Sequence, residues 1–399
     1  MEGDTFRRHS ARLVSLLVRR LGPSHLELAE DAVQAAFLAA LRVWPSRGEP
    51  ENRAGWLATV AWREAIDHLR REGLYAPEAV EAPECGGAPW GVFDDAELEM
   101  LFLCCHPTLA ADEQIALILR ELCGLGTKEI AASLLTTESA LYQRLVRAKR
   151  RLKEADLALP VHIPETRWES VLLALYLLFN EGYASHGDGN LISFELCDEA
   201  IQLVDRLTKT EYGDRPDAHA LCGLMLLQSS RLATRLDANG LVCLLEDQDR
   251  SKWDRARISA GVRRLERACS GTRLSRYHVE AESALQHAVA PNFEATNWTA
   301  VVVAYDDLVR MAPGPIVALN RAIAIGMRSG PAAGLSELAK LELDSNHHFF
   351  AARATMLEKR GCFDEAARDY RKALELASTE AERNWLRHKS DFCLRFCKE

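Results

Sequence analysis

Apolar residues recur at helical spacing along most of the chain, and no stretch shows the alternation of a half-buried strand. The first three such stretches lie at residues 5–21, 26–44 and 54–72, where leucine, valine and alanine stand three or four positions apart. The segment from Pro45 to Arg53 separates the second stretch from the third and is expected to be a turn. The pattern therefore predicts an all-α protein.

The longest interruption of the helical pattern in the first half of the chain follows residue 75. Residues 76–93 are rich in proline, glycine and glutamate, a composition that cannot bury a core and predicts a linker. A second small helical unit is expected at residues 94–157. Pro160 and Pro164 separate it from a long helical region at residues 158–399.

Residues 125–153 contain two short helical patterns joined by a break, and the second begins at about Glu138. The segment 136–153 holds six Lys or Arg residues and one acid, a balance of +5. Two short helices joined tightly, the second of them basic, are typical of a helix-turn-helix that binds in the DNA major groove. Thr127 and Thr137 are the expected N-caps. An ordinary amphipathic helix with a solvated basic face explains the same periodicity, so both interpretations stay open here.

The C-terminal region has repeat character. The segment GCFDEAARDYRKALEL matches the second half of a tetratricopeptide repeat at Gly361, Phe363, Ala366, Tyr370 and Ala373. The segment from Ala312 to about residue 338 looks like a less regular copy. Small alanines let paired helices pack closely, so a helical solenoid is expected, with generic helix pairs as the alternative.

Charge is distributed unevenly along the chain. The net charge is −9, but residues 76–111 hold seven acids and no Lys or Arg, whereas residues 112–155 carry eight basic and six acidic side chains. Because DNA affinity depends on the local basic patch, the acidic total does not exclude DNA binding. No apolar run approaches the ~20 residues of a membrane span. The N-terminus lacks a secretory signal pattern, so a cytoplasmic protein without membrane contact is expected.

The sequence offers little for catalysis or metal binding. It has no nucleophile elbow, Walker loop, dinucleotide fingerprint or HExxH motif, so we expect no enzyme. Cys104, Cys105 and His106 are clustered, and Cys393 and Cys397 lie four apart, but neither group has a second ligand pair nearby. Buried thiols are the expectation, with no metal and no cofactor. GDGN at residues 187–190 is expected to be a loop.

The segment EDQDRSKWD at residues 246–254 is rich in oxygen ligands but lacks the spacing of a calcium loop. We expect a salt-bridged helix junction there, with Arg250 and Arg255 as the partners of its acids.

Residues 1–155 resemble the extracytoplasmic-function (ECF) sigma factors of bacterial RNA polymerase. The motifs that carry the resemblance are AEDAVQAAFLAAL (29–41), AGWLATVAWREAIDHLRRE (54–72) and the helix-turn-helix. The rest of the chain resembles the subgroup with a fused C-terminal tetratricopeptide-like domain. Its marks are LFLCCHPTLA (101–110), LYLLFNEGY (175–183) and LLEDQDRSKWD (244–254).

The resemblance implies four segments. Residues 1–75 correspond to sigma domain 2, which binds core RNA polymerase and the −10 promoter element. Residues 76–93 correspond to an acidic linker, either a nucleic-acid mimic in the polymerase channel or a solvated tether. Residues 94–157 correspond to sigma domain 4, which binds the −35 element. Residues 158–399 correspond to a tetratricopeptide-like regulatory or docking domain.

The resemblance also implies site residues for each partner. Core polymerase is expected to contact Asp31, Gln34 and Phe37. The −10 element is expected to contact Trp62, Arg63, His68, Arg70 and Arg71, while Asp67 is expected to pair with a nearby Arg. The −35 element is expected to contact Thr127, Lys128, Thr137, Ser139, Tyr142, Gln143, Arg144, Arg147, Lys149 and Arg150.

Ala35, Trp62-Arg63 and Glu64 depart from the family pattern at the docking helix and the −10 helix. The expected function is a sigma factor that binds core polymerase and directs promoter-specific initiation. The alternative is a degenerate sigma-like regulator that does not initiate transcription. The C-terminal domain is expected to modulate activity and to contact either the chain's own sigma domains or polymerase. Tyr183, Trp253 and Arg250 are the expected anchors of that contact, and internal packing is the alternative for all three.

Overall fold

The computed structural model describes residues 3–73, 93–134, 136–155, 165–183, 194–237, 242–377 and 379–396. Its regular elements are α-helices and single turns of 3-10 helix, and the described residues form no β-strand beyond an isolated bridge between Leu236 and Val242. The all-α prediction is confirmed. The expected linker at residues 76–93 lies outside the described residues except for Phe93, and so does the loop expected at residues 187–190.

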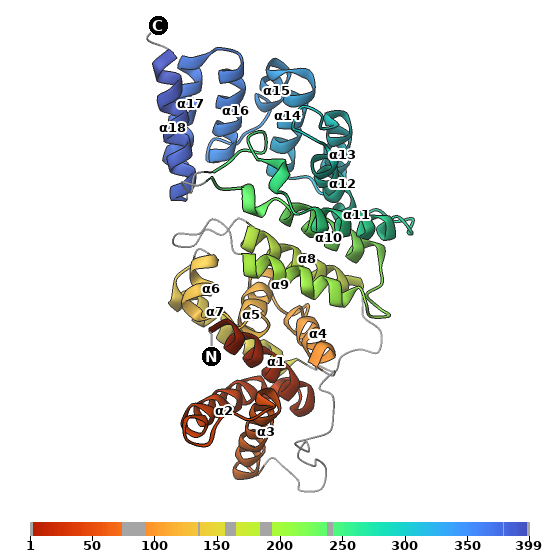
Figure 1. Ribbon diagram of the computed structural model, residues 1–399, viewed down its shortest axis with the longest axis vertical. Helices are drawn as coiled ribbons and strands as arrows, with labels where there is room; N and C mark the ends of the chain where they lie inside the picture. The colour runs from red at the N-terminus through yellow and green to blue at the C-terminus, as the bar shows by residue number, and fades with distance from the viewer. Residues whose placement is uncertain are drawn as a thin grey trace. The chain divides into compact units, whose positions relative to one another are not determined.

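The chain divides into two compact units, Met1–Leu178 and Phe179–Glu399 (Figure 1). The boundary falls inside one helix, α8 (Glu165–Tyr183), and not at residue 157, where the sequence pattern ends the second helical segment. Residues 1–75 and 94–157 therefore belong to a single compact unit. The functional division into four segments stays a prediction.

The first unit is built from helices that follow the sequence periodicity, the longest of which, α2, has 22 residues. They are α1 (Gly3–Leu21), η1 (Pro23–His25), α2 (Leu26–Arg47), α3 (Arg53–Arg71), α4 (Phe93–Cys104), α5 (Ala111–Glu121), α6 (Thr127–Ser133), α7 (Glu138–Glu154) and the first part of α8. The turn expected from Pro45 begins three residues later than predicted, at Gly48. The proline lies in the last turn of α2, and the N–H of Gly48, with φ of 81°, closes the helix on the carbonyl of Trp44.

Helices α1, α2 and α3 pack around one apolar core, and α4 packs on α1. Leu17, Val33 and Leu57 are almost completely buried in this core. The start of α3 is fixed by Asn52, whose side chain accepts a hydrogen bond from the N–H of Gly55 at 2.8 Å. Farther along the unit, the Arg167 guanidinium in the first turn of α8 donates to the carbonyl of Phe102 at 3.1 and 2.7 Å. That contact joins α8 to the end of α4.

The second unit is a succession of helices in which each packs mainly on its neighbours in the chain. They are the end of α8, α9 (Phe194–Leu207), α10 (Pro216–Ser229), η2 (Leu232–Thr234), η3 (Arg250–Lys252), α11 (Arg255–Ala268), α12 (Arg276–Val289), α13 (Trp298–Met311), α14 (Pro315–Ser329), α15 (Pro331–Leu338), α16 (His347–Lys359), α17 (Phe363–Leu376) and α18 (Glu380–Phe396). In Figure 1 the helices from α12 onward stand side by side, as expected for a helical solenoid.

Two details show why this unit folds as paired helices. Gly223 and Gly261 face each other where α10 crosses α11, and a Cβ atom on Gly261 would lie only 2.8 Å from the Cγ atom of Leu227. The absence of side chains at both positions lets the two helices approach closely. In α17 the alanines and Tyr370 of the repeat-like motif are fully buried against α16 and α18.

Candidate DNA and polymerase interfaces

Helices α6 and α7 form the expected pair of short helices. The Thr137 hydroxyl accepts a hydrogen bond from the N–H of Ala140 at 3.2 Å, so the predicted cap of α7 is confirmed. The predicted cap of α6 is wrong by one position, because Thr127 is the first residue of that helix. The carboxylate of Glu129 instead reaches back to the N–H of Gly126 at 2.7 Å.

The packed side and the outward side of α7 are clearly separated. Its core side consists of Leu141, Leu145, Ala148 and Leu152. Its exposed side spans an arc of about 140° at 100° per residue and contains Ser139, Tyr142, Gln143, Val146, Arg147 and Arg150. Tyr142 is 64% exposed and Val146 45% exposed. Thr137 and Lys128 are exposed beside it, whereas Thr127 is half-buried.

Several cations of α7 are held by acids of the same unit. Arg144 lies 3.1 Å from Asp112, and Arg151 lies 2.6 Å from Glu113. The residues expected to contact the −35 element therefore separate into two groups. The outward group is exposed, although Arg150 lies 3.9 Å from Glu154 in a pair that is itself exposed, whereas Arg144 and Lys149 have acidic partners on other helices of the unit.

Lys149 lies in a buried ion cluster that connects three helices. Its Nζ atom is 2.6 Å from both carboxylate oxygens of Glu30 in α2 and 3.3 Å from Oε1 of Glu121 in α5. Burial, together with the neighbouring charge of Glu30, raises the pKa of the Glu121 carboxyl to about 8 despite the ammonium beside it. Burial also disfavours the charged form of Lys149, but the two carboxylates outweigh it and raise its pKa. The cluster attaches α7 to α2.

The exposed side of α3 carries four of the five residues expected at the −10 element. Arg63, His68, Arg70 and Arg71 are all exposed. The Arg70 guanidinium lies 3.6 Å from the carboxylate of Asp67, so the expected pairing of Asp67 with a nearby Arg is present. His68 lies 3.2 Å from Glu72.

Trp62 is the exception in α3. Its side chain is 4% exposed and packs with Ile66 and Leu69, while the Arg20 guanidinium lies 5.6 Å from its ring centroid. A base could stack on this indole only if the ring left the core. The expectation that Trp62 contacts DNA is therefore revised, and Trp62 is a packing residue of α3.

The expected docking helix α2 shows a similar division. Asp31 and Gln34 are exposed, but Phe37 is 3% exposed and belongs to the core, so its expected contact with polymerase is revised. Phe37 and Gln34 line a cavity of about 160 Å³ between α2, α1 and the end of α5. The sequence analysis missed Leu38 and Leu41, which are 54% and 69% exposed and share the face of Gln34. The sequence signal that could have found them is the presence of two leucines on the otherwise polar side of this helix.

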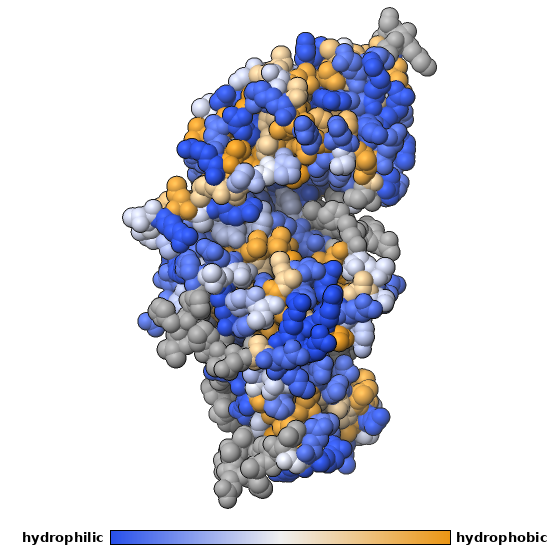
Figure 2. All heavy atoms as spheres, turned by 180° about the vertical axis from the view of Figure 1, so that it is seen from behind, coloured by the Kyte–Doolittle hydropathy of each residue, from blue (hydrophilic) through white to orange (hydrophobic). Residues whose placement is uncertain are grey.

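Exposed apolar side chains are visible at this end of the molecule. Figure 2 shows orange side chains among blue ones over the segment that contains α2 and α3, at the lower end of the view. A helix face that combines exposed leucines with Asp31 and Gln34 suits a protein partner, because apolar anchors with a polar rim characterise such interfaces.

Three families match successive parts of the chain. The family described as Sigma-70 region 2 matches residues 5–74, and Sigma-70, region 4 matches residues 99–152. A family of unknown function, DUF6596, matches residues 167–269. The first two matches cover α1–α3 and α4–α7, the helices that carry the candidate faces.

Two sigma factors align to the same part of the chain. The RNA polymerase sigma factor CarQ of Myxococcus xanthus is 33% identical over 38% of this chain and 86% of its own length. The ECF RNA polymerase sigma-E factor of Escherichia coli (strain K12) is 31% identical over 35% of this chain and 78% of its own length. The chain belongs to the ECF sigma factors. Core RNA polymerase and promoter DNA are the partners that this membership implies.

A third relative aligns along nearly all of this ECF sigma factor. The uncharacterized protein R00370 of Rhizobium meliloti (strain 1021) is 36% identical over 92% of this chain and 90% of its own length. The sigma regions and the C-terminal helices therefore occur together in a second protein. No solved structure matches the chain. Among the described residues, no helix has the length and apolarity that a membrane crossing requires.

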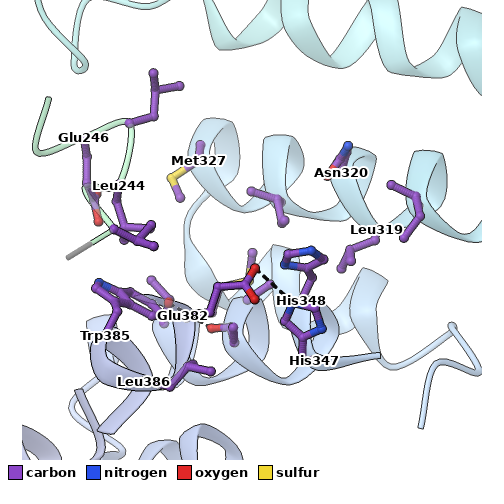
Figure 3. A pocket seen from close by; sticks show the side chains of 18 of the residues that line it. Leu244, Glu246, Leu319, Asn320, Met327, His347, His348, Glu382, Trp385 and Leu386 are labelled. Atoms are coloured by element: carbon purple, nitrogen blue, oxygen red, sulfur yellow. Dashed lines mark hydrogen bonds and ion pairs between the residues drawn. The ribbon is translucent and has the colours of Figure 1, made fainter. Parts of the chain in front are cut away.

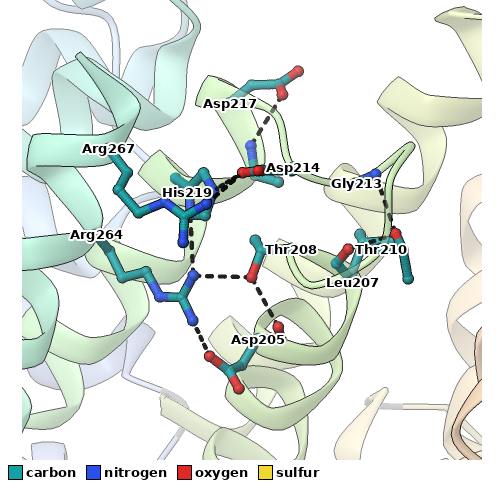
Figure 4. A network of polar contacts seen from close by, with 11 residues as sticks. Asp205, Leu207, Thr208, Thr210, Gly213, Asp214, Asp217, His219, Arg264 and Arg267 are labelled. Carbon is teal, nitrogen blue, oxygen red and sulfur yellow. Dashed lines mark hydrogen bonds and ion pairs between the residues drawn. The ribbon is translucent and has the colours of Figure 1, made fainter. Parts of the chain in front are cut away.

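The DUF6596 part of the sigma factor contains a polar network between α9, α10 and α11 (Figure 4). Nε2 of His219 lies 2.7 Å from Asp214, and Arg264 donates to its Nδ1 at 3.1 Å. Burial and the two nearby arginines lower the pKa of His219, against the effect of Asp214. A neutral imidazole that donates from Nε2 and accepts at Nδ1 satisfies both contacts, so the network serves to join these helices.

The EDQDRSKWD segment forms a salt-bridged junction as expected, but its acids Glu246, Asp249 and Asp254 pair with Lys359, Lys252 and Arg257 rather than with Arg250 and Arg255. The Arg250 guanidinium donates to the carbonyl of Ala290 at 2.9 Å and lies 4.7 Å from the ring centroid of Trp253. Arg255 donates to the carbonyl of Arg250 at 3.3 Å rather than to an acid. Asp254 caps α11.

Two of the three anchors expected for a contact of the C-terminal domain are internal. Trp253 and Arg250 are 3% and 8% exposed, and the guanidinium of Arg235 lies 4.0 Å from the ring centroid of the half-buried Tyr183. Trp253 and Arg250 are therefore internal packing residues, as the alternative interpretation expected, whereas the role of the half-buried Tyr183 as an anchor stays a prediction. Burial of Cys104, Cys105 and Cys393 agrees with the expectation of buried thiols, whereas Cys397 lies outside the described residues.

Proposed function

We propose that this ECF sigma factor binds core RNA polymerase through α2, reads the −35 element through α7 and directs initiation at a specific set of promoters, and that its C-terminal helices modulate this activity. The outward face of α7 carries the proposal. Its residues combine amide and guanidinium donors with an aromatic ring and a small apolar side chain, and the fold leaves them exposed.

The chemistry of that face suits the major groove. Gln pairs with adenine and Arg with guanine through two hydrogen bonds each, and apolar groups contact the thymine methyl. Gln143 and Arg147 supply the first two contacts, and Val146 between them supplies the third. We expect the exposed Lys128 on α6 and the exposed Thr137 to contact phosphate, because the first helix of a helix-turn-helix crosses the DNA backbone.

Promoter binding requires the first unit to open. The names of the −10 and −35 elements give their positions relative to the transcription start. The two elements are therefore about 25 base pairs apart, which is about 85 Å at 3.4 Å per pair. A compact unit of this size has a radius of gyration of about 16 Å, so it cannot reach both elements at once. The ion cluster of Lys149, Glu30 and Glu121 joins α7 to α2 and α5 in the compact form. We infer that polymerase binding to α2 competes with this packing.

Modulation by the C-terminal helices is supported by their size and by their shared occurrence in R00370, which aligns over 92% of this chain. It is tested by comparing the full chain with residues 1–183, which keep α8 and the bonds from Arg167 to Phe102. We expect different transcript yields from the two proteins. Equal yields would exclude modulation but leave promoter direction intact.

Run-off transcription with purified core polymerase is the central experiment. The variant Leu38→Asp/Leu41→Asp places charge on the exposed face of α2 and should abolish co-purification with core polymerase. The matched control is Leu274→Asp, which alters a leucine that is 63% exposed in the C-terminal unit. If the double variant co-purifies normally with core polymerase, the exposed face of α2 is not part of the docking surface.

The same assay separates the proposal from its alternative. A degenerate sigma-like regulator would bind promoter DNA or polymerase without producing a transcript. If the full chain binds core polymerase and yields no run-off product from any promoter fragment that it binds, the alternative is correct.

A further inference from the structure

The C-terminal unit contains a cavity of about 540 Å³ (Figure 3). Its walls are mostly apolar and come from the segment 242–246, from α14, from α16 and from α18. Leu319, Met327 and Trp385 are among the apolar side chains that face it. Cavities of this size with a few convergent polar groups are typical of ligand sites. In such sites the polar groups determine which ligand the cavity binds.

Three side chains with metal-binding atoms meet at one side of this cavity. His347 and His348 begin α16, and Glu382 lies in the first turn of α18. Their ligand atoms all lie within 4.8 Å of one another, and they form the one such group of three among the described residues. Figure 3 shows the Glu382 carboxylate directed at the two imidazole rings.

We propose that His347, His348 and Glu382 bind one divalent transition-metal ion, with Zn²⁺ as the ion that their ligand types favour. Two imidazole nitrogens and one carboxylate oxygen are the protein ligands of open zinc sites, whose remaining position is taken by water or another ligand. Here that position faces the cavity. This inference is independent of the proposed role in transcription.

The spacing of the ligand atoms supports a metal better than an ion pair. The contact between Nε2 of His347 and Oε1 of Glu382 is 3.4 Å, which is long for a hydrogen bond. In a tetrahedral zinc site with bonds of about 2.1 Å, neighbouring ligand atoms are about 3.4 Å apart. All three ligand atoms lie within 4.8 Å of one another, so each is close to the spacing that a single ion requires. The ring centroids of His347 and His348 are 3.9 Å apart, so both rings already lie beside one position.

The surrounding bonds orient the ligands. The N–H and hydroxyl of Thr379 contact Oε2 of Glu382 at 3.3 and 2.9 Å, which leaves Oε1 directed at the histidines. Asn346 accepts a hydrogen bond from the N–H of Phe349 at 3.2 Å and fixes the start of α16. Such outer contacts are typical of metal ligands, because they hold a carboxylate in its binding orientation before the ion arrives.

The test uses the full chain, stripped of metal by a chelator and then titrated with Zn²⁺ against a competing chromogenic chelator. We expect one zinc ion per chain at this site. The variants His348→Ala and Glu382→Gln should each weaken that binding by at least about tenfold. His388→Ala is the matched control, because His388 is exposed on the same helix as Glu382 but does not line the cavity.

Glu382→Gln distinguishes a lost ligand from a lost fold. Glutamine at the third position of a helix can keep the capping contact with Thr379, so the thermal midpoint without metal should match that of the wild type. Zinc should then raise the midpoint of the wild type and of His388→Ala, and should leave those of Glu382→Gln and His348→Ala almost unchanged.

Co²⁺ identifies the ligands by absorption spectroscopy. We expect visible bands of a four- or five-coordinate site without a sulfur-to-cobalt charge-transfer band, because the proposed ligands include no cysteine. A strong charge-transfer band that persists in His348→Ala would assign the ion to thiolates. That result, or equal zinc affinity in the wild type and both ligand variants, would overturn the proposal.

Discussion

Helices α7 and α3 are both expected to contact DNA, yet the fold treats them differently. Nearly all residues proposed for α7 lie outside its apolar side, and those without acidic partners on other helices form one exposed face. In α3 the aromatic residue proposed to stack on a base is a core residue, and only charged side chains remain outside. The α7 face presents an amide, a guanidinium, an aromatic ring and an apolar side chain, whereas the α3 face presents mainly cations and two acids.

The difference shows that a match to a family motif does not by itself establish that a side chain contacts DNA. In the structure Trp62 packs with Ile66 and Leu69, which lie four and seven positions further along the same helix. The resemblance assigned it to DNA because of its place in a motif. Where the two disagreed, burial of a large apolar ring prevailed, since it contributes roughly 2 kcal/mol or more to folding.

The largest expected effect tests Trp62 as a packing residue. Trp62→Ala should lower the free energy of unfolding by about 3–5 kcal/mol, because it removes a buried indole and leaves a cavity. Tyr142→Ala, at a position that is 64% exposed, should change it by no more than about 0.5 kcal/mol. Denaturant unfolding of both variants measures the contrast. If the Trp62→Ala protein has wild-type stability, Trp62 is not a packing residue and is again a candidate for contact with DNA.

The second effect tests the face of α7. Arg147→Ala should weaken binding to a cognate −35 fragment by about 1–3 kcal/mol and relax base preference at one position if Arg147 reads a guanine. A uniform loss with a smaller salt dependence would mean a phosphate contact instead. Arg144→Ala should cost less, because Asp112 already holds its guanidinium 3.1 Å away. Arg360→Ala, at an exposed position of the C-terminal unit, is the control. Unchanged binding of Arg147→Ala would contradict the interface.

The third effect tests the cluster that joins α7 to α2 and α5. The pKa of Glu121 is about 8 in the folded chain, against an ordinary value of 4.5. Between these values the folded state holds a proton that the unfolded state has lost, so the free energy of unfolding falls as pH rises, by at most about 1.4 kcal/mol per pH unit.

Glu121→Gln should remove this contribution. Denaturant unfolding at pH 5, 6.5 and 8 measures the difference between variant and wild type. We expect the variant to gain stability relative to the wild type as the pH increases. A difference that stays constant across the three pH values would show that Glu121 titrates at its ordinary value.

The smallest effect tests the exposed pairs of α3. Arg70 and Asp67 are 60% and 62% exposed at their side chains and lie 3.6 Å apart. Exposed pairs contribute about 0–1 kcal/mol, so Asp67→Ala should leave the free energy of unfolding almost unchanged. Removal of the acid should instead strengthen binding to a −10 fragment at low salt. Weaker binding would mean that Asp67 positions Arg70 for DNA.

The sequence by itself determined the helices and the family. Periodicity located α1–α3 and the pair α6–α7 to within a few residues, because the 3.6-residue repeat follows directly from burying one side of a helix. It also separated Leu141, Leu145 and Ala148 from the outward residues of α7, whereas Ala140, which follows the same spacing, is exposed. Motifs in their expected order identified an ECF sigma factor, and the matches to both sigma regions confirm it.

Only the tertiary structure decided which polar residues meet. Lys149 and Glu30 are 119 positions apart, and no local pattern connects them. The same holds for His348 and Glu382, whose atoms come together because α16 and α18 start near one another. Exposure of Leu38 and Leu41, and burial of Arg250, likewise depend on what packs beside them. Local spacing sets the direction of a side chain on its helix, but its partner is set by contacts between segments distant in the chain.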